Sequence, residues 1–303
     1  GPGWMWDDDP DDYNMSISGI MMDYNVLRAK AAWDGQVFKV EFFPAMNKPF
    51  MVLSNPQAEG KTALEITREP FTDIFELRGI PSNTSQETTK ALTMHYPPTW
   101  VQQVLQKDAE DLGITIIGNK TPSIYRDDKI IGQIESKTLA EMITRLNKVS
   151  ENAIGEMLIH HLAIAGGAKQ GNWPDGAAFV TKWLKEKPGL DEGDSRIVDG
   201  SGLSRYDLVC AQGTVKLLKW MSTHKDFNVY KDSFPIYAAK LKDGTEVKTI
   251  HAKPGGMAAV NTLAGYADRP DGSMLVFAIF QNGYVDEKPV IALRKAILQE
   301  LVN

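Results

Sequence analysis

Three short stretches of the sequence carry side chains that could do chemistry together. The first, Ser150-Glu151-Asn152, places a hydroxyl and an amide two residues apart. On a continuous α-helix this spacing turns the two side chains about 200° away from each other, so they can face one site only where the chain turns between two helices. The alternative is that the serine caps the helix that follows it. Taken alone, the motif leaves a structural cap and a functional pair open.

The second stretch, residues 198–209, reads VDGSGLSRYDLV and packs two glycines, two serines and an arginine into residues 200–205. Such a loop offers backbone N–H groups and one planar guanidinium, that of Arg205. It lacks the spacing of a phosphate-binding P-loop. By itself the stretch is more readily explained as a tight turn than as a binding site.

The third stretch is Lys253-Pro254-Gly255-Gly256, at the expected head of an apolar strand. A lysine followed by glycines could hold a carboxylate, because glycines let a ligand approach the backbone. The proline is harder to explain, since proline within a sheet is confined to edges and bulges.

Bulk properties limit the classes of function. The 303 residues are 43% apolar and 24% charged, as in an ordinary globular protein, and the net charge of −6 argues against a nucleic acid or an anionic membrane as partner. The single cysteine, Cys210, excludes an internal disulfide and a cysteine-rich zinc site. His160-His161 has no partners at ligand spacing, so we expect no metal and no cofactor. We find no secretory signal and no apolar run of membrane-spanning length.

The elements that position these stretches change in type along the chain. Residues 1–14 are aromatic and acidic and are expected to form a solvated loop. Residues 15–96 have a β-like pattern that predicts a small β-rich domain. Its strand candidates are residues 16–22, 37–43, 62–69 and 74–80.

Helical spacing begins after Pro97-Pro98, and Gly113 is placed to end the first helix. An apolar hairpin is expected around the turn at residues 268–272. Helices on either side of an antiparallel sheet predict an α+β fold. The further helices are predicted near residues 137–149, 153–162, 214–223 and 289–302.

In this order, the three stretches resemble the penicillin-binding proteins of low-molecular-mass class C, which are periplasmic D-alanyl-D-alanine carboxypeptidases and endopeptidases. Ser150-Glu151-Asn152 matches that family's SxN motif, and Lys253-Pro254-Gly255 stands where its KTG motif belongs. Residues 261–282 (NTLAGYADRPDGSMLVFAIFQN) and the opening GPGWMWDD resemble further family segments. The resemblance runs from Gly3 to the C-terminus.

The resemblance implies an α+β domain of the penicillin-binding-protein and β-lactamase type, preceded by a small β-rich inserted domain. It implies an aromatic and acidic segment of an inserted domain at 1–24, the β-rich domain at 25–96, and the remainder of the inserted domain at 97–135. Residues 136–303 would be the C-terminal part of the transpeptidase-like domain. It also implies a bacterial, extracytoplasmic hydrolase.

The resemblance assigns roles to the catalytic stretches. Ser150 would belong to a proton relay, and the Asn152 amide would hold the substrate's peptide carbonyl. Lys253 would direct positive charge toward the carboxylate of the terminal D-Ala, and the Gly256 N–H would be one of two oxyanion donors.

The resemblance also assigns contacts with the peptidoglycan stem peptide. Positions matching Asp8, Tyr13 and Arg205 touch it in family members, and Asp8 would suit an ammonium group such as that of diaminopimelate. Gly255 would let the substrate approach the strand.

Two departures from the family pattern matter. The nucleophile motif SxxK, which comes first in the family, is missing here: Ser222-Thr223-His224-Lys225 lies downstream of SxN and is interpreted as a decoy. The chain also begins without an initiator methionine, so we expect an upstream segment to supply the nucleophile. The partners are then a stem peptide, β-lactams only if that segment is present, and possibly the protein's own N-terminal portion.

The second departure is Pro254 in place of the KTG threonine. The lost hydroxyl removes a hydrogen bond to a charged group, worth roughly 1.5–3 kcal/mol, or about 10- to 150-fold in binding or rate. Two main hypotheses stay open: a serine-type peptidase of which this chain is a part, or a degenerate relative that binds peptidoglycan or a protein without catalysis. A third is an unrelated function on the same scaffold.

Overall fold

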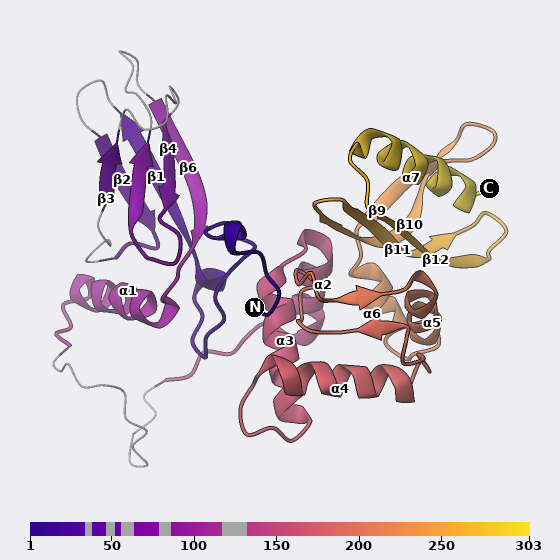
Figure 1. Ribbon diagram of the computed structural model, residues 1–303, viewed down its shortest axis with the longest axis horizontal. Coiled ribbons are helices and arrows are strands. Elements are labelled where there is room, and N and C mark those ends of the chain that lie inside the picture. Colours follow the sequence, from indigo (N-terminus) through magenta and orange to yellow (C-terminus); the bar gives the residue numbers. More distant parts are fainter. Residues whose placement is uncertain (34–37, 47–51, 56–63, 79–85, 117–131) are drawn as a thin grey trace. The chain divides into compact units, whose positions relative to one another are not determined.

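The computed structural model describes residues 1–33, 38–46, 52–55, 64–78, 86–116 and 132–303. The chain divides into two compact units (Figure 1). Unit 1 consists of residues 1–3 and 136–303, and unit 2 of residues 4–135. Each unit is described by itself. Among the described residues, no helix combines the length and the apolar character needed to cross a membrane.

Unit 1 is built on one antiparallel sheet in the order β12-β11-β10-β9. Its strands are β9 (Ile236–Lys240), β10 (Glu246–Met257), β11 (Val260–Asp268) and β12 (Met274–Asn282). The predicted hairpin is present: β11 and β12 pair from Val260↔Asn282 to Asp268↔Met274, and Gly272 has a φ of 82° in the turn. The short strands β7 (Ser195–Arg196) and β8 (Leu208–Val209) form a separate pair.

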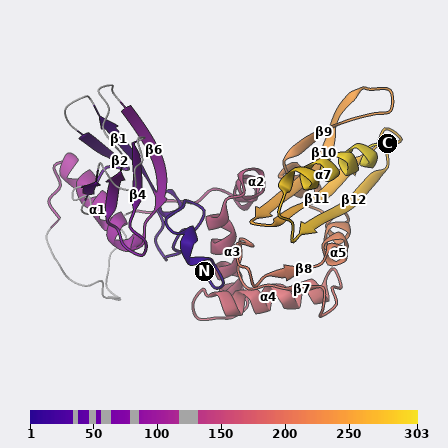
Figure 2. The same cartoon turned by 45° about the horizontal axis from the view of Figure 1, so that its top comes forward.

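Helices cover both faces of this sheet. Ile250 and Ala252 of β10 are fully buried on the face covered by α7 (Glu287–Leu301), which contributes Leu298 (Figure 2). On the opposite face Tyr266 of β11 packs with Leu218, and its hydroxyl donates to the Leu218 carbonyl. Because side chains alternate along a strand, Lys253 shares this second face. The other helices are α2 (Leu139–Val149), α3 (Asn152–Ala165), α4 (Trp173–Glu186), α5 (Ala211–Met221) and α6 (Phe227–Asp232).

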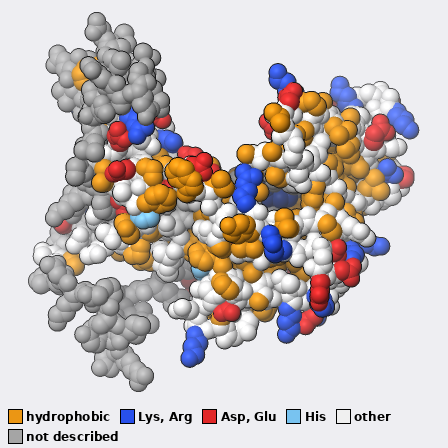
Figure 3. All heavy atoms as spheres, in the orientation of Figure 1, with side chains coloured by type: hydrophobic (Ala, Val, Ile, Leu, Met, Phe, Trp, Pro, Cys, Tyr) orange, Lys and Arg blue, Asp and Glu red, His pale blue; other side chains and the backbone are white. Residues whose placement is uncertain are grey.

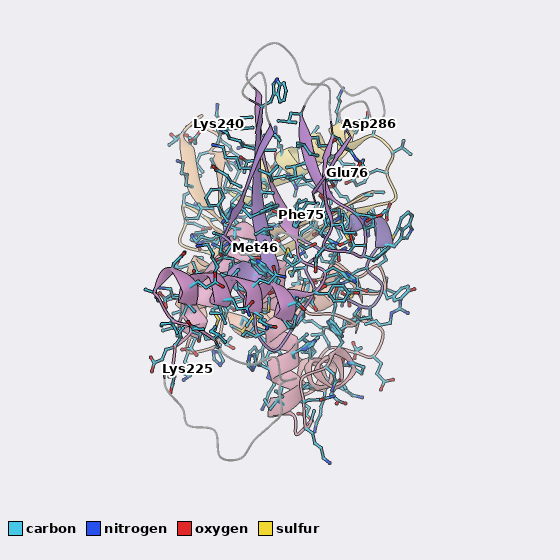
Figure 4. The ribbon with its side chains drawn as sticks, turned by 90° about the vertical axis from the view of Figure 1, so that its left-hand side faces the viewer. Met46, Phe75, Glu76, Lys225, Lys240 and Asp286 are labelled. Carbon is cyan, nitrogen blue, oxygen red and sulfur yellow. The ribbon has the colours of Figure 1, made fainter. Side chains whose placement is uncertain are left out.

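The described part of unit 2 contains two three-stranded sheets and the α-helix α1 (Pro97–Asp111). Its core includes Met46 and Phe75, both labelled in Figure 4, together with Trp100 of α1. The first sheet has the order β2-β1-β6, with β1 (Val26–Trp33), β2 (Phe38–Phe43) and β6 (Gln86–Thr93). The second has the order β3-β5-β4, with β3 (Val52–Asn55), β4 (Glu65–Arg68) and β5 (Phe75–Arg78).

The structure corrects several sequence predictions of elements. Residues 16–22 are not a strand, because the Ser16 carbonyl accepts from Asn25 Nδ2, and the chain then makes a left-handed turn at Asp23–Asn25. Strands β1 and β6 were missed. Alanines (Ala29 and Ala31) carry most of the buried side of β1, and alanine is a weak strand signal. Strand β6 (QETTKALT) is mostly polar and lacks a clear alternation of apolar and polar residues. Helices α4 and α6 were also missed.

Candidate active site

The first and third sequence stretches meet in a direct contact. Lys253 Nζ donates to Ser150 Oγ over 2.8 Å, although the two residues are 103 positions apart. Nζ also donates to the Pro254 carbonyl at 2.7 Å. One ammonium therefore connects strand β10 to the junction of α2 and α3.

The junction makes this contact possible by a local turn at Ser150. Helix α2 ends at Val149, Ser150 has left-handed backbone angles (φ 58°, ψ 50°), and α3 begins at Asn152. The turn that Ser150 and Asn152 need in order to face one site is therefore present. The capping interpretation is wrong, because Glu151 precedes α3 and makes no side-chain cap bond, whereas Ser150 ends α2.

Two polar contacts hold the end of α2 in place. Arg145 Nη2 bonds Glu151 Oε2 at 2.8 Å across the turn. The buried Asn147 Nδ2 donates to Ser233 Oγ at 2.7 Å. A left-handed serine is costly, so these contacts are needed to keep its hydroxyl aimed at Lys253.

Lys253 does not stand at the head of its strand, as the sequence suggested, because β10 begins at Glu246. The lysine marks the place where the strand loses its neighbour on one side. The last residue pair between β10 and β9 is His251↔Ile236, and Ala252 N donates to the Pro235 carbonyl just beyond it. In the described part of unit 1, the edge of β10 is therefore open from Lys253 onward.

This open edge explains how the strand accommodates Pro254. Backbone N–H groups two residues apart point to the same side of a strand, so the nitrogen of Pro254 faces the same side as that of Ala252. That side is the open edge, and no hydrogen bond to β11 is lost. The Gly256 N–H faces the same open side. A Cβ at Gly255 would meet Thr262 Oγ1 at 2.6 Å, so a larger residue there would make the Thr262 side chain move.

The electrostatics of Lys253 suit proton exchange. Burial lowers the pKa of its ammonium from the ordinary lysine value. The serine hydroxyl beside it is solvent-exposed. A hydroxyl that receives a hydrogen bond from an ammonium of lowered pKa can pass a proton outward and regain one from the lysine.

The loop that carries Arg205 is held by buried acids. Glu156 of α3 is fully buried, and its Oε1 accepts from Gly200 N at 3.0 Å and Ser201 N at 2.7 Å. Its other oxygen accepts from Trp173 Nε1 at 2.5 Å. Sequence reasoning missed Glu156, although an acid within the apolar run IGEML is a signal that could have found it.

Asp199 completes the loop by accepting from the backbone N–H groups of Gly202 and Ser204, each at 2.7 Å. The Arg205 guanidinium then reaches the β10–β11 turn, where its Nη1 donates to the Ala258 carbonyl at 3.1 Å. Arg205 and the Ser150–Lys253 contact thus lie at opposite ends of residues 253–258.

Two further site predictions belong to unit 2. Asp8 and Tyr13 lie in unit 2, where the Tyr13 hydroxyl donates to Asp8 Oδ1 at 2.9 Å. Burial, with the hydrogen bond to Asp8, raises the pKa of Tyr13. Their contact with a ligand held by Arg205 stays a prediction. The hydroxyl of Ser222 donates to the Lys219 carbonyl at 2.7 Å.

No group of acids, histidines and cysteine in the described residues is arranged to hold a metal ion. His160 packs edge-on against Trp173, with ring centroids 4.7 Å apart, and burial lowers its pKa. His161 is exposed.

Comparison with known proteins places the chain in a family. A model of the D-Ala-D-Ala carboxypeptidase 3 (S13) family matches residues 1–302. D-alanyl-D-alanine carboxypeptidase DacB of Haemophilus influenzae is 24% identical over 314 residues, covering 94% of this chain and 62% of that protein. The D-alanyl-D-alanine carboxypeptidase of Actinomadura sp. (strain R39) is 26% identical over 330 residues, covering 99% and 60%. The chain thus spans about three fifths of the length of these two relatives.

A solved structure supports the fold. Penicillin binding protein 4 (dacB) from Haemophilus influenzae matches with a TM-score of 0.75 at 22% identity, over 99% of this chain and 71% of that one. The predicted α+β fold, with an antiparallel sheet flanked by helices, is confirmed.

Proposed function

The chain belongs to the D-Ala-D-Ala carboxypeptidase 3 (S13) family, as the sequence motifs predicted, and on that premise we propose that it forms part of a serine-type carboxypeptidase or endopeptidase. Its substrate would be the peptidoglycan stem peptide. The observation that supports this function most directly is the 2.8 Å contact from Lys253 Nζ to Ser150 Oγ. A hydroxyl and an ammonium brought together from motifs so far apart in sequence are suited to moving a proton.

The proposed reaction proceeds through an acyl-enzyme. A serine in an SxxK motif outside these 303 residues gives its proton to the lysine of that motif and attacks the carbonyl between the two D-Ala residues, and the resulting oxyanion accepts from the Gly256 N–H. Ser150 passes a proton to the departing D-Ala amine and regains one from Lys253. Water then hydrolyses the ester and releases the shortened peptide.

The same residues suit the substrate's charges. The Lys253 ammonium complements the carboxylate of the terminal D-Ala, and the Asn152 amide would donate to the peptide carbonyl. Arg205, Asp8 and Tyr13 would contact the stem peptide, with Asp8 opposite an ammonium. A stem peptide lies outside the cytoplasm of a bacterium, so we propose an extracytoplasmic location. β-Lactams would bind covalently only where the outside segment supplies its serine.

Pro254 favours a second candidate function, binding without catalysis. It removes the hydroxyl that the family's threonine would offer to the substrate carboxylate, at the position next to Lys253. The strand tolerates this proline because its nitrogen faces the open edge. Strand stability therefore does not decide between an active enzyme and a retired one.

The test uses the longer gene product that includes any SxxK serine, with a soluble D-Ala-D-Ala peptide as substrate. We expect D-Ala release by the unmodified protein, and a loss of about 100-fold or more in kcat for Ser150→Ala and Lys253→Ala. Ser222→Ala is the matched control and should leave kcat unchanged. A longer protein that has the SxxK serine, folds, and releases no D-Ala would favour the non-catalytic function.

A further inference from the structure

Strained backbone occurs at two places in the described residues. Non-glycine residues with a positive φ flank the candidate active site at Ser150 (58°) and Ala259 (59°). The others lie in unit 2, at Asp23–Asn25 and at Phe71, whose φ is 60°. Such a conformation is unusual for a bulky aromatic residue and tends to persist where function requires it.

The strained residues of unit 2 gather at one end of its sheets. Strand β1 starts directly after Asn25, and its first residue pairs with Thr93, the last residue of β6. Met94 N donates to the Asn25 carbonyl at 3.0 Å. Phe71 lies in the turn between β4 and β5, and Arg68, at the end of β4, bonds Thr93 Oγ1 at 3.3 Å. Loops at one end of a scaffold commonly carry binding residues.

Three aromatic side chains meet at this end. The rings of Phe71 and His95 are 6.2 Å apart at 76°, and those of His95 and Tyr96 are 4.5 Å apart at 81°. Phe71 is 52% exposed and Tyr96 is 57% exposed, so both rings face solvent instead of the core. We call Phe71, His95 and Tyr96 the aromatic platform.

Buried charges hold the platform in place. Asp73 is only 5% exposed, and its carboxylate accepts from His95 N at 2.7 Å and Tyr96 N at 3.1 Å. Asp9 Oδ2 accepts from Phe71 N at 2.8 Å, and the same carboxylate pairs with the buried guanidinium of Arg68. Asp73 and Asp9 thus fix the backbone that presents these exposed rings.

We propose that the aromatic platform binds the glycan strand of peptidoglycan, a polymer of N-acetylated pyranose rings. The proposal rests on the proposed function, because a stem-peptide enzyme works on peptides attached to that polymer. The C–H face of a pyranose packs against an aromatic ring, whose negative face attracts polarised C–H groups. The exposed Glu69, in the same turn as Phe71, is an acceptor for sugar hydroxyls.

Other ligand classes fit less well. Three rings cover about the area of one or two sugars, far less than the roughly 800 Å² per partner that a stable protein interface buries. The net charge of −6 and the neighbouring carboxylates repel a nucleic acid. Hydrophobic side chains do gather on the face of unit 2 seen in Figure 3, but beside acidic ones.

The test exploits the left-handed backbone of Phe71. Glycine adopts a positive φ without strain, so Phe71→Gly removes the ring and leaves the fold intact. The probe is peptidoglycan glycan strand, freed of peptides by an amidase and of bound protein by a protease. We expect the 303-residue chain to bind it, and Phe71→Gly and Tyr96→Ala to bind about ten-fold more weakly or worse. Phe43→Ala is the matched control, since that ring on β2 is 51% exposed, and it should bind normally.

Each other outcome overturns the proposal. Unchanged binding by Phe71→Gly would show that the ring makes no contact, and a fall in its Tm would show that the ring is structural. Binding only before the peptides are removed would assign the surface to stem peptides, and binding only before protease treatment would assign it to a protein. D-Ala release from a soluble peptide does not involve glycan, so a failure there would count against the proposed function and not against this platform.

Discussion

Pro254 is the residue on which the choice between enzyme and binding protein depends. Its nitrogen faces the open edge of β10, so replacing it with threonine adds a hydroxyl and an N–H without disturbing the ladder to β11. In the longer gene product, we expect Pro254→Thr to raise kcat/KM on a D-Ala-D-Ala peptide by about ten-fold or more, because the hydroxyl would donate to a charged acceptor. A steady-state D-Ala release assay measures this. An active protein that is slowed by the substitution would mean that the proline is an adaptation.

Asp207 makes the loop of Arg205 sensitive to pH. Burial, with the hydrogen bond and charge of Asp199, raises the pKa of the Asp207 carboxyl to about 8 from 3.8. Between these values the folded chain holds a proton that the unfolded chain has lost. The group's contribution to stability is therefore full below pH 3.8 and falls as the pH rises toward 8.

We therefore expect Asp207→Asn, which mimics the protonated acid, to flatten the decline of Tm between about pH 5 and pH 8. The Asn oxygen can still accept from Val198 N, as Asp207 Oδ1 does at 2.6 Å. Thermal unfolding at a series of pH values provides the measurement. Identical pH profiles for the two proteins would contradict the account in which folded Asp207 holds a proton.

Ser222 and Lys225 have the spacing of an SxxK motif, but their side chains are not placed to react together. Its hydroxyl is engaged by the Lys219 carbonyl, and the Lys225 ammonium is 84% exposed at 4.0 Å from Asp226. Acylation needs a serine beside an activating base, so we expect no covalent adduct when the 303-residue chain is incubated with penicillin. Intact-mass spectrometry checks this, and a stoichiometric gain located at Ser222 would refute the decoy interpretation.

At the scale of elements, the residue that the proposed function needs at the junction of α2 and α3 lowers the stability of the fold. Ser150 holds a left-handed conformation that costs an L-residue roughly 1–2 kcal/mol, part of which glycine would recover. We expect Ser150→Gly to leave the free energy of unfolding unchanged or to raise it by up to about 1 kcal/mol, while it removes the relay hydroxyl. Denaturant unfolding measures the first effect, and D-Ala release by the longer protein measures the second. Ser150→Ala keeps the strain and is the control; a Ser150→Gly protein less stable than Ser150→Ala would contradict this account.

Helix α2 also has a strongly amphipathic pattern, whose apolar side chains the described residues cover only in part. Its spacing aligns Leu139, Met142, Ile143, Leu146 and Val149, yet the only buried residue of the helix is Asn147. Leu139 and Val149 are 55% and 61% exposed. An apolar stripe of this kind needs a partner surface to be stable in water.

At the scale of the whole molecule, one expectation follows from the exposed apolar side chains of α2 and from the nucleophile that we propose lies outside these 303 residues. If a further segment completes the site, it should cover α2, and amide hydrogen exchange across residues 139–149 should slow by about ten-fold or more in the longer gene product. The core strand β11 serves as the control, since Leu263 and Tyr266 are already fully buried. Equal exchange of α2 in both proteins would show that no further segment covers this helix.

The two units divide the proposed work. Unit 1 carries the Ser150–Lys253 contact and Arg205, and unit 2 carries the aromatic platform with Asp8 and Tyr13. Catalysis is thus proposed for unit 1 and glycan binding for unit 2, and contacts with the stem peptide are proposed for both.

The sequence by itself determined the features that depend on local pattern and on motif identity. The β11–β12 hairpin, helices α1, α2, α3, α5 and α7, and the family followed from apolar spacing, turn residues and the order of three motifs. Strand β1 was not predicted because alanine is a weak strand signal. Residues 16–22 were wrongly predicted as a strand because the Asn25 side chain donates a hydrogen bond to the Ser16 carbonyl.

Only the tertiary structure decided what each motif residue touches. That Ser150 adopts a left-handed turn, that Lys253 reaches it, and that Pro254 faces an open edge depend on where β9 stops beside β10. Glu156 and Asp73 act through backbone N–H groups brought close by folding, and the aromatic platform joins segments separated by more than twenty residues. These contacts are long-range, and a linear pattern records spacing along the chain but not which distant segments pack together.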